Sequence, residues 1–276
     1  MAITAADVNK LRQQTGAGMM DCKNALVESN GDFEAAIDIL RKKGQKIAAK
    51  RGENEAKEGL IFAQASNDGK TGVILALNCE TDFVAMNDNF RGFMQSLVDI
   101  ALANMPASID ELKALPYDDK LSVEEKITEH VGVVGEKLDL SKYATIIAAQ
   151  VCAYNHPGNQ LATLVGLSDA SEAAEEAGKQ VAMQVAAMNP LALNKDGIDQ
   201  NTIDRELEIG KELAIQEGKP ADMAEKISQG RLNKFFQENT LLSQPFVRDN
   251  KLTVAEFLNT AGKGLTVTSF ERFAMK

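Results

Sequence analysis

The strongest constraint on the fold is a pair of strand-like runs joined by a short polar segment. The runs GLIFAQAS and TGVILALNC flank Asn67-Asp68-Gly69-Lys70, and the Asp-Gly pair suits a tight hairpin turn, which needs positive φ at its centre. Residues Val73 to Leu77 are all apolar, which indicates a buried strand. The flanking sequence must therefore supply elements that cover this hairpin.

The residues before the hairpin follow a helical spacing instead. Thr4 is placed to cap a first helix with Asp7 in the capping-box position. Residues Met19 to Glu28 predict a second helix, with Met19 among its apolar positions. Asp32 begins a third helix, which the basic run RKKGQK is expected to end. Three such helices can share one small core.

A charged stretch from Arg41 to Gly59 separates these helices from the hairpin. It is punctuated by glycine and has little apolar content after Ile47, which is typical of an exposed linker, so we place a boundary near residue 54. Residues 1–54 contain nine Lys/Arg and seven Asp/Glu, a balance of +2. Since the whole chain carries −10, the remainder carries −12.

Two similar units follow this boundary. In the first, Asn87 and Ser122 are placed to cap helices that pack on the hairpin. In the second, YATIIAAQVCAYN and QLATLVGLS predict a strand pair around His156-Pro157-Gly158. A helix from Ser171 to Met188 and a late strand in LTVTSFERFAM complete the second unit.

A different element interrupts the second unit. Two polar-rich helical patterns, Asn201 to Glu217 and Pro220 to Gln237, are separated by Gly218-Lys219-Pro220. Their apolar positions form a stripe too narrow for a globular core, so we expect a projecting helical hairpin at about residues 196–229. The stripe consists of Ile203, Leu207, Leu213, Met223 and Ile227.

These patterns together predict an α+β protein in three parts. We expect a three-helix bundle followed by a two-part core of small antiparallel sheets packed with helices, with the helical hairpin inserted. The predicted parts are residues 1–54, residues 55–140 and residues 141–276.

Composition limits the class of protein and its partners. With 44% hydrophobic and 25% charged residues, the chain has the balance of a soluble globular protein. Its net charge of −10 disfavours nucleic acid, since binding to phosphates depends on Lys and Arg, so we expect a protein partner. No apolar stretch approaches the roughly 18 residues of a membrane span. The start MAITAADVNK also lacks the order of a signal peptide, and we expect a cytoplasmic protein that binds no membrane.

Signals for catalysis, metals and cofactors are weak. The three cysteines form no C-x-x-C pair, which argues against a disulfide framework and a zinc site. The GKT of Asp68-Gly69-Lys70-Thr71 occurs in phosphate-binding loops, but Gln64 stands where that motif needs a glycine. Only His130 and His156 occur, and neither lies near a cysteine in a nucleophile signature. We therefore expect no catalytic residue, no metal site and no cofactor.

One segment departs from the composition of a surface loop. The stretch NCETDFVAMN, residues 78–87, follows the buried strand and places Phe83 in the turn before the next helix. Loops usually carry polar and small residues. Phe83 therefore either fills a gap in the protein's own core or contacts a partner, and the local sequence leaves both possibilities open.

Four motifs, in order along nearly the whole chain, resemble the translation elongation factor Ts family. They are LRQQTGAGMMDCKNAL near the N-terminus, CETDFVAMNDNF after the hairpin, GRLNKFF at residues 230–236 and SQPFV at residues 243–247. The resemblance implies that the N-terminal bundle is ubiquitin-associated-like. It also implies a guanine-nucleotide exchange factor without covalent chemistry of its own, which binds elongation factor Tu in its GDP-bound and nucleotide-free forms.

The resemblance also implies a role for the unusual loop. Thr81, Asp82, Phe83 and Val84 match the motif with which the family dislodges Mg²⁺ from its partner. By resemblance, Phe83 inserts between helices of the GTPase domain and Asp82 contacts an adjacent helix. GDP then leaves faster, because its phosphates lose their main counter-charge.

Further positions match contact residues of the family. Met19, Met20 and Lys23 resemble a docking surface for the GTPase domain, although Met19 is also a candidate core residue. His156 matches a histidine that contacts the distal domain of the partner. The residues after it, Pro157-Gly158-Asn159-Gln160, depart from the glycine turn with a basic residue that many members keep. The chain ends three residues after Phe273, so we expect the C-terminal helical module of longer members to be missing.

Two other classes of function are weighed against exchange. A small-molecule enzyme would need a pocket with convergent titratable groups. A protein-binding adaptor would use the bundle and the helical hairpin as binding modules without any effect on a nucleotide.

Overall fold

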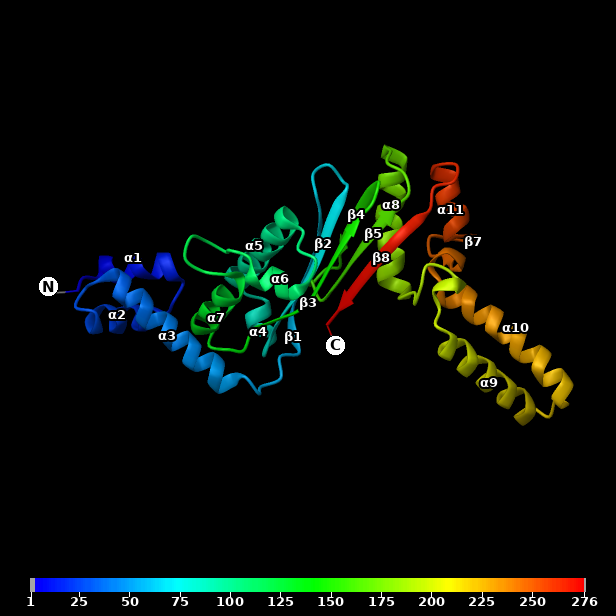
Figure 1. Cartoon of the computed structure of the whole chain (residues 1–276), viewed down its shortest axis with the longest axis horizontal. Helices are drawn as coiled ribbons and strands as arrows, with labels where there is room; N and C mark the ends of the chain where they lie inside the picture. The colour runs from blue at the N-terminus through cyan, green and yellow to red at the C-terminus, as the bar shows by residue number, and fades with distance from the viewer. Residues whose placement is uncertain (1–2, 276) are drawn as a thin grey trace.

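The elements of the chain are arranged in layers along one long axis. The structure is a computed structural model and describes residues 3–275, so the outermost residues of the first and last predicted parts lie outside the description. From one end to the other, Figure 1 shows a helical bundle, a first sheet with helices, a second sheet with helices, and a helical hairpin. The structure is α+β, as predicted.

The bundle consists of α1 (Ala5–Thr15), α2 (Met19–Glu28) and α3 (Phe33–Arg51). The predicted capping box of Thr4 and Asp7 is present, and the Asp32 side chain caps α3. The bundle core is made of small and medium apolar side chains from all three helices. It contains Val8, Leu11, Ala17, Cys22, Ala25, Leu26 and Ala36.

The prediction that α3 ends in RKKGQK is wrong. The helix continues through this basic run to Arg51, so the predicted linker shrinks to residues 52–57. The reason is tertiary: Gly44 is buried, and Ile47 and Ala48 pack against the core of the first sheet unit. Packing of an apolar face determines a helix end more strongly than the local density of charge.

The first sheet contains the hairpin that the sequence predicts. It has the order β1 (Glu58–Ala65), β2 (Thr71–Cys79) and β3 (Asp139–Ile147), with both pairs antiparallel. Four helices accompany it, of which α6 was not predicted and α4 stands where a turn was predicted. They are α4 (Asp82–Ala85), α5 (Asp88–Asn104), α6 (Ile109–Ala114) and α7 (Val123–Val134).

The second sheet has the order β4 (Gln150–Asn155), β5 (Leu161–Leu167) and β8 (Val267–Ala274), also antiparallel. Its outer face packs on α8 (Glu172–Met188), and α11 (Val254–Ala261) packs against α8 in the same core. A small ladder of β6 (Pro245–Phe246) and β7 (Asp249–Thr253) precedes α11. The inner faces of the two sheets share one apolar layer, made of Ile61, Ala63, Ile74, Ala76, Ile146, Val151, Ala162 and Leu164.

The run YATIIAAQVCAYN is not one strand, contrary to the prediction. Its first part belongs to β3 and pairs with β2, whereas its second part is β4 and pairs with β5. The chain therefore changes sheets at Ala148 and Ala149. A continuous apolar run does not reveal such a change, because both inner faces are buried. The predicted division between residues 140 and 141 lies within β3.

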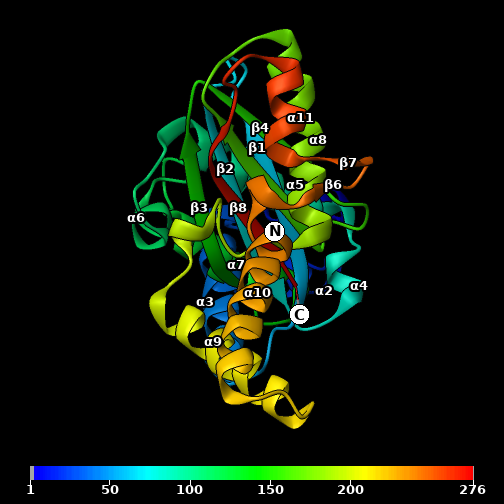
Figure 2. The same cartoon turned by 90° about the vertical axis from the view of Figure 1, so that its right-hand side faces the viewer.

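The inserted helical hairpin is present and consists of α9 (Gln200–Gln216) and α10 (Ala221–Asn239). Short 3₁₀ helices at Lys195–Gly197 and Leu241–Ser243 flank it. Figure 2 shows that it extends beyond the sheets. The predicted stripe is wrong in part, since Leu213 and Met223 are exposed. The contact between the helices consists mainly of small residues, which allow close approach: Gly210, Ala214, Ala224, Ser228 and Leu232.

No helix within residues 3–275 is long and apolar enough to cross a membrane.

Candidate functional site

Phe83 points into solvent rather than into the protein's own core. It lies in α4, the four-residue helix that directly follows the first hairpin, and its side chain is 83% exposed. The neighbouring Ala85 is buried and Val84 packs against the first core, so α4 is attached to the protein through these two residues. Of the two possibilities that the sequence left open, the structure excludes a Phe83 that fills a gap in its own core.

The start of α4 is held by a carboxylate from the loop between α7 and β3. Glu136, just after α7, accepts a hydrogen bond from the Thr81 hydroxyl at 2.6 Å and one from the Thr81 backbone N–H at 3.0 Å. The Thr81 hydroxyl oxygen in turn accepts a bond from the Val84 N–H at 3.5 Å. Thr81, the N-cap residue of α4, is therefore bonded to Glu136, and these bonds fix the position of the helix that carries Phe83.

Glu80 ties the preceding residue to two other elements. Its carboxylate accepts hydrogen bonds from the Lys137 backbone N–H at 2.6 Å, the Arg51 guanidinium at 2.8 Å and the Asn54 side chain at 2.9 Å. Desolvation raises the pKa of Glu80, but these hydrogen bonds together outweigh it and lower the pKa. The two acids of the unusual loop therefore differ: Glu80 is anchored, whereas Asp82 is exposed beside Phe83.

Sequence reasoning missed three residues of this site. Met86, at the end of α4, is 73% exposed and adds apolar surface beside Phe83. Glu136 and Arg51 lie 55 and 29 residues from the groups that they contact, so no local pattern points to them. Met86 could have been found, because it stands in the same apolar loop segment as Phe83.

The three predicted docking residues of α2 share one exposed region. Met19 is 53% exposed, Met20 is 62% exposed and Lys23 is exposed as well. The expectation that Met19 belongs to the apolar core face of α2 is wrong, because the core side of α2 is made of Cys22, Ala25 and Leu26. Met19 lies at the first helical position of α2, outside this buried set.

His156 is exposed in the turn between β4 and β5 of the second sheet, whereas Phe83 lies in α4 beside the first sheet. Its Nδ1 lies 2.9 Å from the Tyr154 hydroxyl. The turn is fixed by Asn159, which has a positive φ of 56°. The Asn159 side-chain oxygen accepts a bond from Arg91 of α5 at 2.6 Å, and its backbone oxygen accepts one from the Ile61 N–H at 2.7 Å. His156 and Phe83 are therefore presented by one connected framework.

Two of the cysteine thiols are buried and have raised pKa values. Burial, and secondarily the charge of Glu136, raises the pKa of the Cys79 thiol to about 12, and burial raises the pKa of Cys152 to about 11. Both thiols are therefore protonated at neutral pH. Among residues 3–275, no three His, Cys, Asp or Glu side chains are placed to hold a metal ion. The site offers exposed apolar and charged surface on anchored elements, which suits contact with another macromolecule.

Comparison with known proteins identifies the family. The family model described as Elongation factor TS matches residues 80–276, a range that includes α4, strand β3 of the first sheet and the whole second sheet. The chain is 53% identical to Elongation factor Ts of Christiangramia forsetii and 55% identical to that of Amoebophilus asiaticus, each over 99% of this chain and 98% of the relative. It is 49% identical to Elongation factor Ts of Cytophaga hutchinsonii over 99% of both chains. The chain therefore belongs to the elongation factor Ts family, a family of translation elongation factors.

Proposed function

We propose that this protein is a guanine-nucleotide exchange factor for elongation factor Tu. It binds the GDP-bound partner, displaces Mg²⁺ and the helices around the nucleotide, and so lets GDP leave and GTP rebind. The observation that carries the proposal is Phe83, a large apolar side chain that is 83% exposed on a short, anchored helix. When a partner buries an aromatic ring that is exposed to water in this way, the burial contributes favourably to the free energy of binding.

The mechanism follows from how a GTPase holds its metal. Mg²⁺ demands near-ideal octahedral geometry and is held by a phosphate-loop hydroxyl, a carboxylate and the nucleotide phosphates. In the proposed mechanism Phe83 inserts between helices of the GTPase domain, and Asp82 contacts an adjacent helix. A small shift of these helices removes a metal ligand, and the phosphates then lose their main counter-charge. Thr81 and Val84 hold α4 on its own protein while Phe83 is inserted.

The remaining contact residues are assigned to docking. Met19, Met20 and Lys23 bind the GTPase domain, and His156 contacts the distal domain of the partner. A ubiquitin-associated-like character of the bundle and the division at residues 54 and 140 stay predictions. The protein needs no covalent chemistry of its own, because exchange requires only that its contacts be stronger in the displaced state than in the initial complex.

The test is the release of fluorescent GDP from elongation factor Tu, timed with and without this protein. We expect release to speed up with rising concentration of the protein and to reach a plateau. A protein-binding adaptor would bind elongation factor Tu without changing the rate, and a small-molecule enzyme would show neither effect. Binding without acceleration would therefore contradict the proposal.

A further inference from the structure

The helix α3 belongs to two hydrophobic cores at once. Its first half contributes Ala36 to the bundle core, with Ile37 and Leu40 beside it. Its second half places Ile47 and Ala48 against the core of the first sheet unit. Figure 1 shows α3 running from the bundle past α7 toward β1. Because one uninterrupted helix joins the two cores, the bundle is not attached by a flexible tether.

We propose that the contact of α3 with α7 is a rigid joint that positions the docking residues of α2 relative to Phe83. This inference rests on the proposed exchange function. It makes Gly44, Gly132, Arg41 and Glu129 positioning residues, which touch neither the partner nor the nucleotide.

Two glycines set the distance between the helices at the joint. A Cβ atom added to Gly132 of α7 would lie 2.9 Å from the Gly44 Cα, closer than real Cβ contacts. A Cβ added to Gly44 would lie 3.0 Å from the Thr128 backbone oxygen. Both glycines are in regular helices, where glycine is otherwise unfavourable, so close approach is what requires them.

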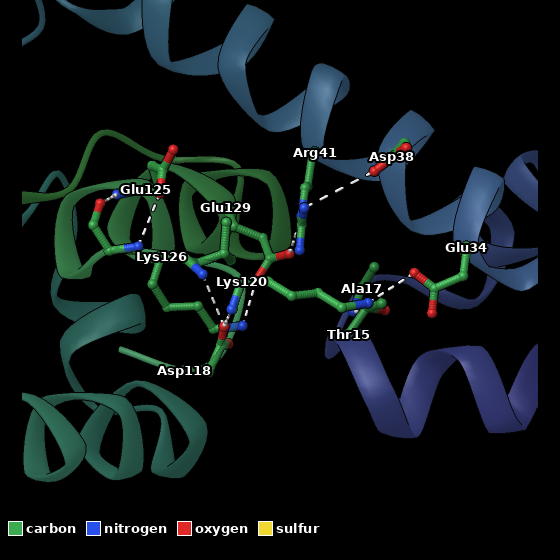
Figure 3. Close-up of polar contacts among 12 residues, drawn as sticks. Thr15, Ala17, Glu34, Asp38, Arg41, Asp118, Lys120, Glu125, Lys126 and Glu129 are labelled. Carbon is green, nitrogen blue, oxygen red and sulfur yellow. Dashed lines mark hydrogen bonds and ion pairs between the residues drawn. The ribbon is translucent and has the colours of Figure 1, made fainter. Parts of the chain in front are cut away.

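Charged side chains hold the same joint from the side. Glu129 of α7 pairs with Arg41 of α3, with 3.4 Å between Nε and Oε1, and also with Lys126 (Figure 3). Only 13% of the Glu129 side chain is exposed, so water screens these pairs less than pairs at the open surface. A second link, from Lys120 to Glu34 at 2.8 Å, lies nearer the bundle.

The far end of α3 reaches the base of the Phe83 helix. Arg51, its last residue, pairs with Glu80 at 2.8 Å, and Glu80 directly precedes the Thr81 cap of α4. The path from the bundle to the base of the Phe83 helix therefore runs through α3 and the ion pair of Arg51 with Glu80. No glycine-rich or unstructured segment intervenes on this path.

A rigid joint and a flexible tether have different kinetic consequences. In a rigid body, binding of the α2 residues helps to place Phe83, so remote binding free energy lowers the barrier to GDP release. A tether would only raise the local concentration of Phe83, and this advantage disappears once the complex is saturated. Damage to a rigid joint therefore lowers the maximal rate of release at saturating protein.

The first experiment compares Gly132→Ala with Gly92→Ala. Gly92 is a glycine of α5 whose added Cβ would meet no atom within 4 Å, so its variant controls for the change in helix propensity. We expect Gly132→Ala to lower the maximal rate of GDP release about three- to tenfold, which lies within the range of typical coupling effects. Gly92→Ala should match the parent. In a Phe83→Ala background the effect of Gly132→Ala should shrink, because the joint acts through Phe83.

A second experiment measures the joint without the partner. Spin labels at Gln13→Cys on α1 and Ala103→Cys on α5 report the distance between bundle and core, since the native cysteines are buried. We expect a narrow distance distribution for the parent and a broader or shifted distribution for Gly132→Ala. We expect the same change for Glu129→Gln, a variant that removes a charge of the joint but leaves the contact between Gly44 and Gly132 intact.

The outcomes separate this inference from the proposed function. A broad distribution in the parent, or an unchanged maximal rate in a variant whose distribution has broadened, overturns the rigid joint. If Gly132→Ala does not fold, the maximal rate and the distance distribution of Glu129→Gln test the rigid joint in its place. Failure of the parent to accelerate GDP release overturns the exchange function instead, while the distance measurement still decides whether the joint is rigid.

Discussion

At the scale of single residues, Phe83 and Phe90 show how one residue type takes two roles seven positions apart. Phe83 is 83% exposed on α4, whereas Phe90 is fully buried in the first core. Burial of a phenylalanine contributes to stability only where the folded state removes the ring from water. The two residues therefore form a matched pair for separating function from folding.

Phe83→Ala is expected to leave the melting temperature nearly unchanged, while Phe90→Ala is expected to lower the free energy of unfolding by about 3–5 kcal/mol. Thermal and urea unfolding followed by circular dichroism measure both. A Phe83→Ala variant that melts well below the parent would show that the ring stabilises its own protein after all.

His130 gives the protein a pH dependence that can be measured without a partner. Burial, helped by the charge of Lys126 against the opposing charge of Glu129, lowers its pKa from 6.5 to about 4. Its ring stacks on Phe93 at 4.1 Å, and its buried Nε2 has no hydrogen-bond partner. Between these pH values the unfolded state binds more protons than the folded state, so stability falls as the pH falls from about 6.5 toward 4.

We expect this loss to be on the order of 3 kcal/mol, because each pKa unit corresponds to about 1.4 kcal/mol. His130→Phe, which keeps an aromatic ring, should lose less stability over the same range. Urea unfolding at several pH values tests this, and parallel pH profiles of variant and parent would contradict it.

Local signals at this scale were predictable, and distant partners were not. The caps of Thr4, Asn87 and Ser122 were predicted correctly, because a cap depends on residues within one helical turn. The bonds from Thr81 to Glu136 join residues 55 positions apart, and only the fold brings them together. The assignment of a role to Phe83 came from the family motif, and its exposure came from the structure.

At the scale of elements, the anchoring of α4 has a close counterpart elsewhere in the chain. Thr253 caps α11 and donates from its N–H to Glu256 at 2.7 Å and from its hydroxyl at 3.0 Å, much as Thr81 donates to Glu136. The two carboxylates hold similar caps, but only Glu136 supports the helix of Phe83.

Glu136→Ala should destabilise the protein by about 1–3 kcal/mol, because it leaves the part-buried donors of Thr81 without their charged acceptor. Glu256→Ala should destabilise the protein less, because water can replace the exposed Glu256 carboxylate at the donors of Thr253. Only Glu136→Ala should also slow stimulated GDP release, by about tenfold if about 1.4 kcal/mol of positioning is lost. The comparison requires rates measured under conditions where both variants are folded. Equal rates for the two would contradict a role of α4 anchoring in exchange.

The helical hairpin is expected to be dispensable for folding of the core. Its buried residues pack between α9 and α10, and its ion pair of Arg231 and Glu217 is internal, at 2.7 Å. Replacement of residues 204–233 by a short Gly/Ser linker should leave a single cooperative thermal transition. Aggregation of the purified variant, or loss of the transition, would show that the hairpin supports the second sheet unit.

Element types were predicted better than element ends. Helical and strand periods identified the hairpin of β1 and β2, the helix α8 and the inserted helices, because each period reflects a buried face. The end of α3 was missed, since Ile47 and Ala48 pack on residues that are distant in sequence. The change of sheets after Ile147 was missed because both strands are apolar.

At the scale of the whole molecule, the layers place three sets of exposed residues on one connected framework. The α2 residues lie on the bundle, Phe83 lies beside the first sheet, and His156 lies on the second sheet. The shared apolar layer between the sheets and the Asn159 contacts join these parts. Periodicity alone could not predict this stacking, because it shows which face is buried but not against what.

The central claim is that Phe83 accelerates GDP release by displacing the Mg²⁺ of the partner. Stopped-flow release of fluorescent GDP from elongation factor Tu, by the parent and by Phe83→Ala, tests it most directly when repeated with a chelator. With Mg²⁺ present, we predict that Phe83→Ala is about ten- to a hundredfold slower, since burial of a phenylalanine contributes roughly 1.5–3 kcal/mol and each tenfold needs about 1.4 kcal/mol. With Mg²⁺ removed, the difference should shrink. Equal rates in Mg²⁺, or a difference that chelation leaves unchanged, would contradict the account.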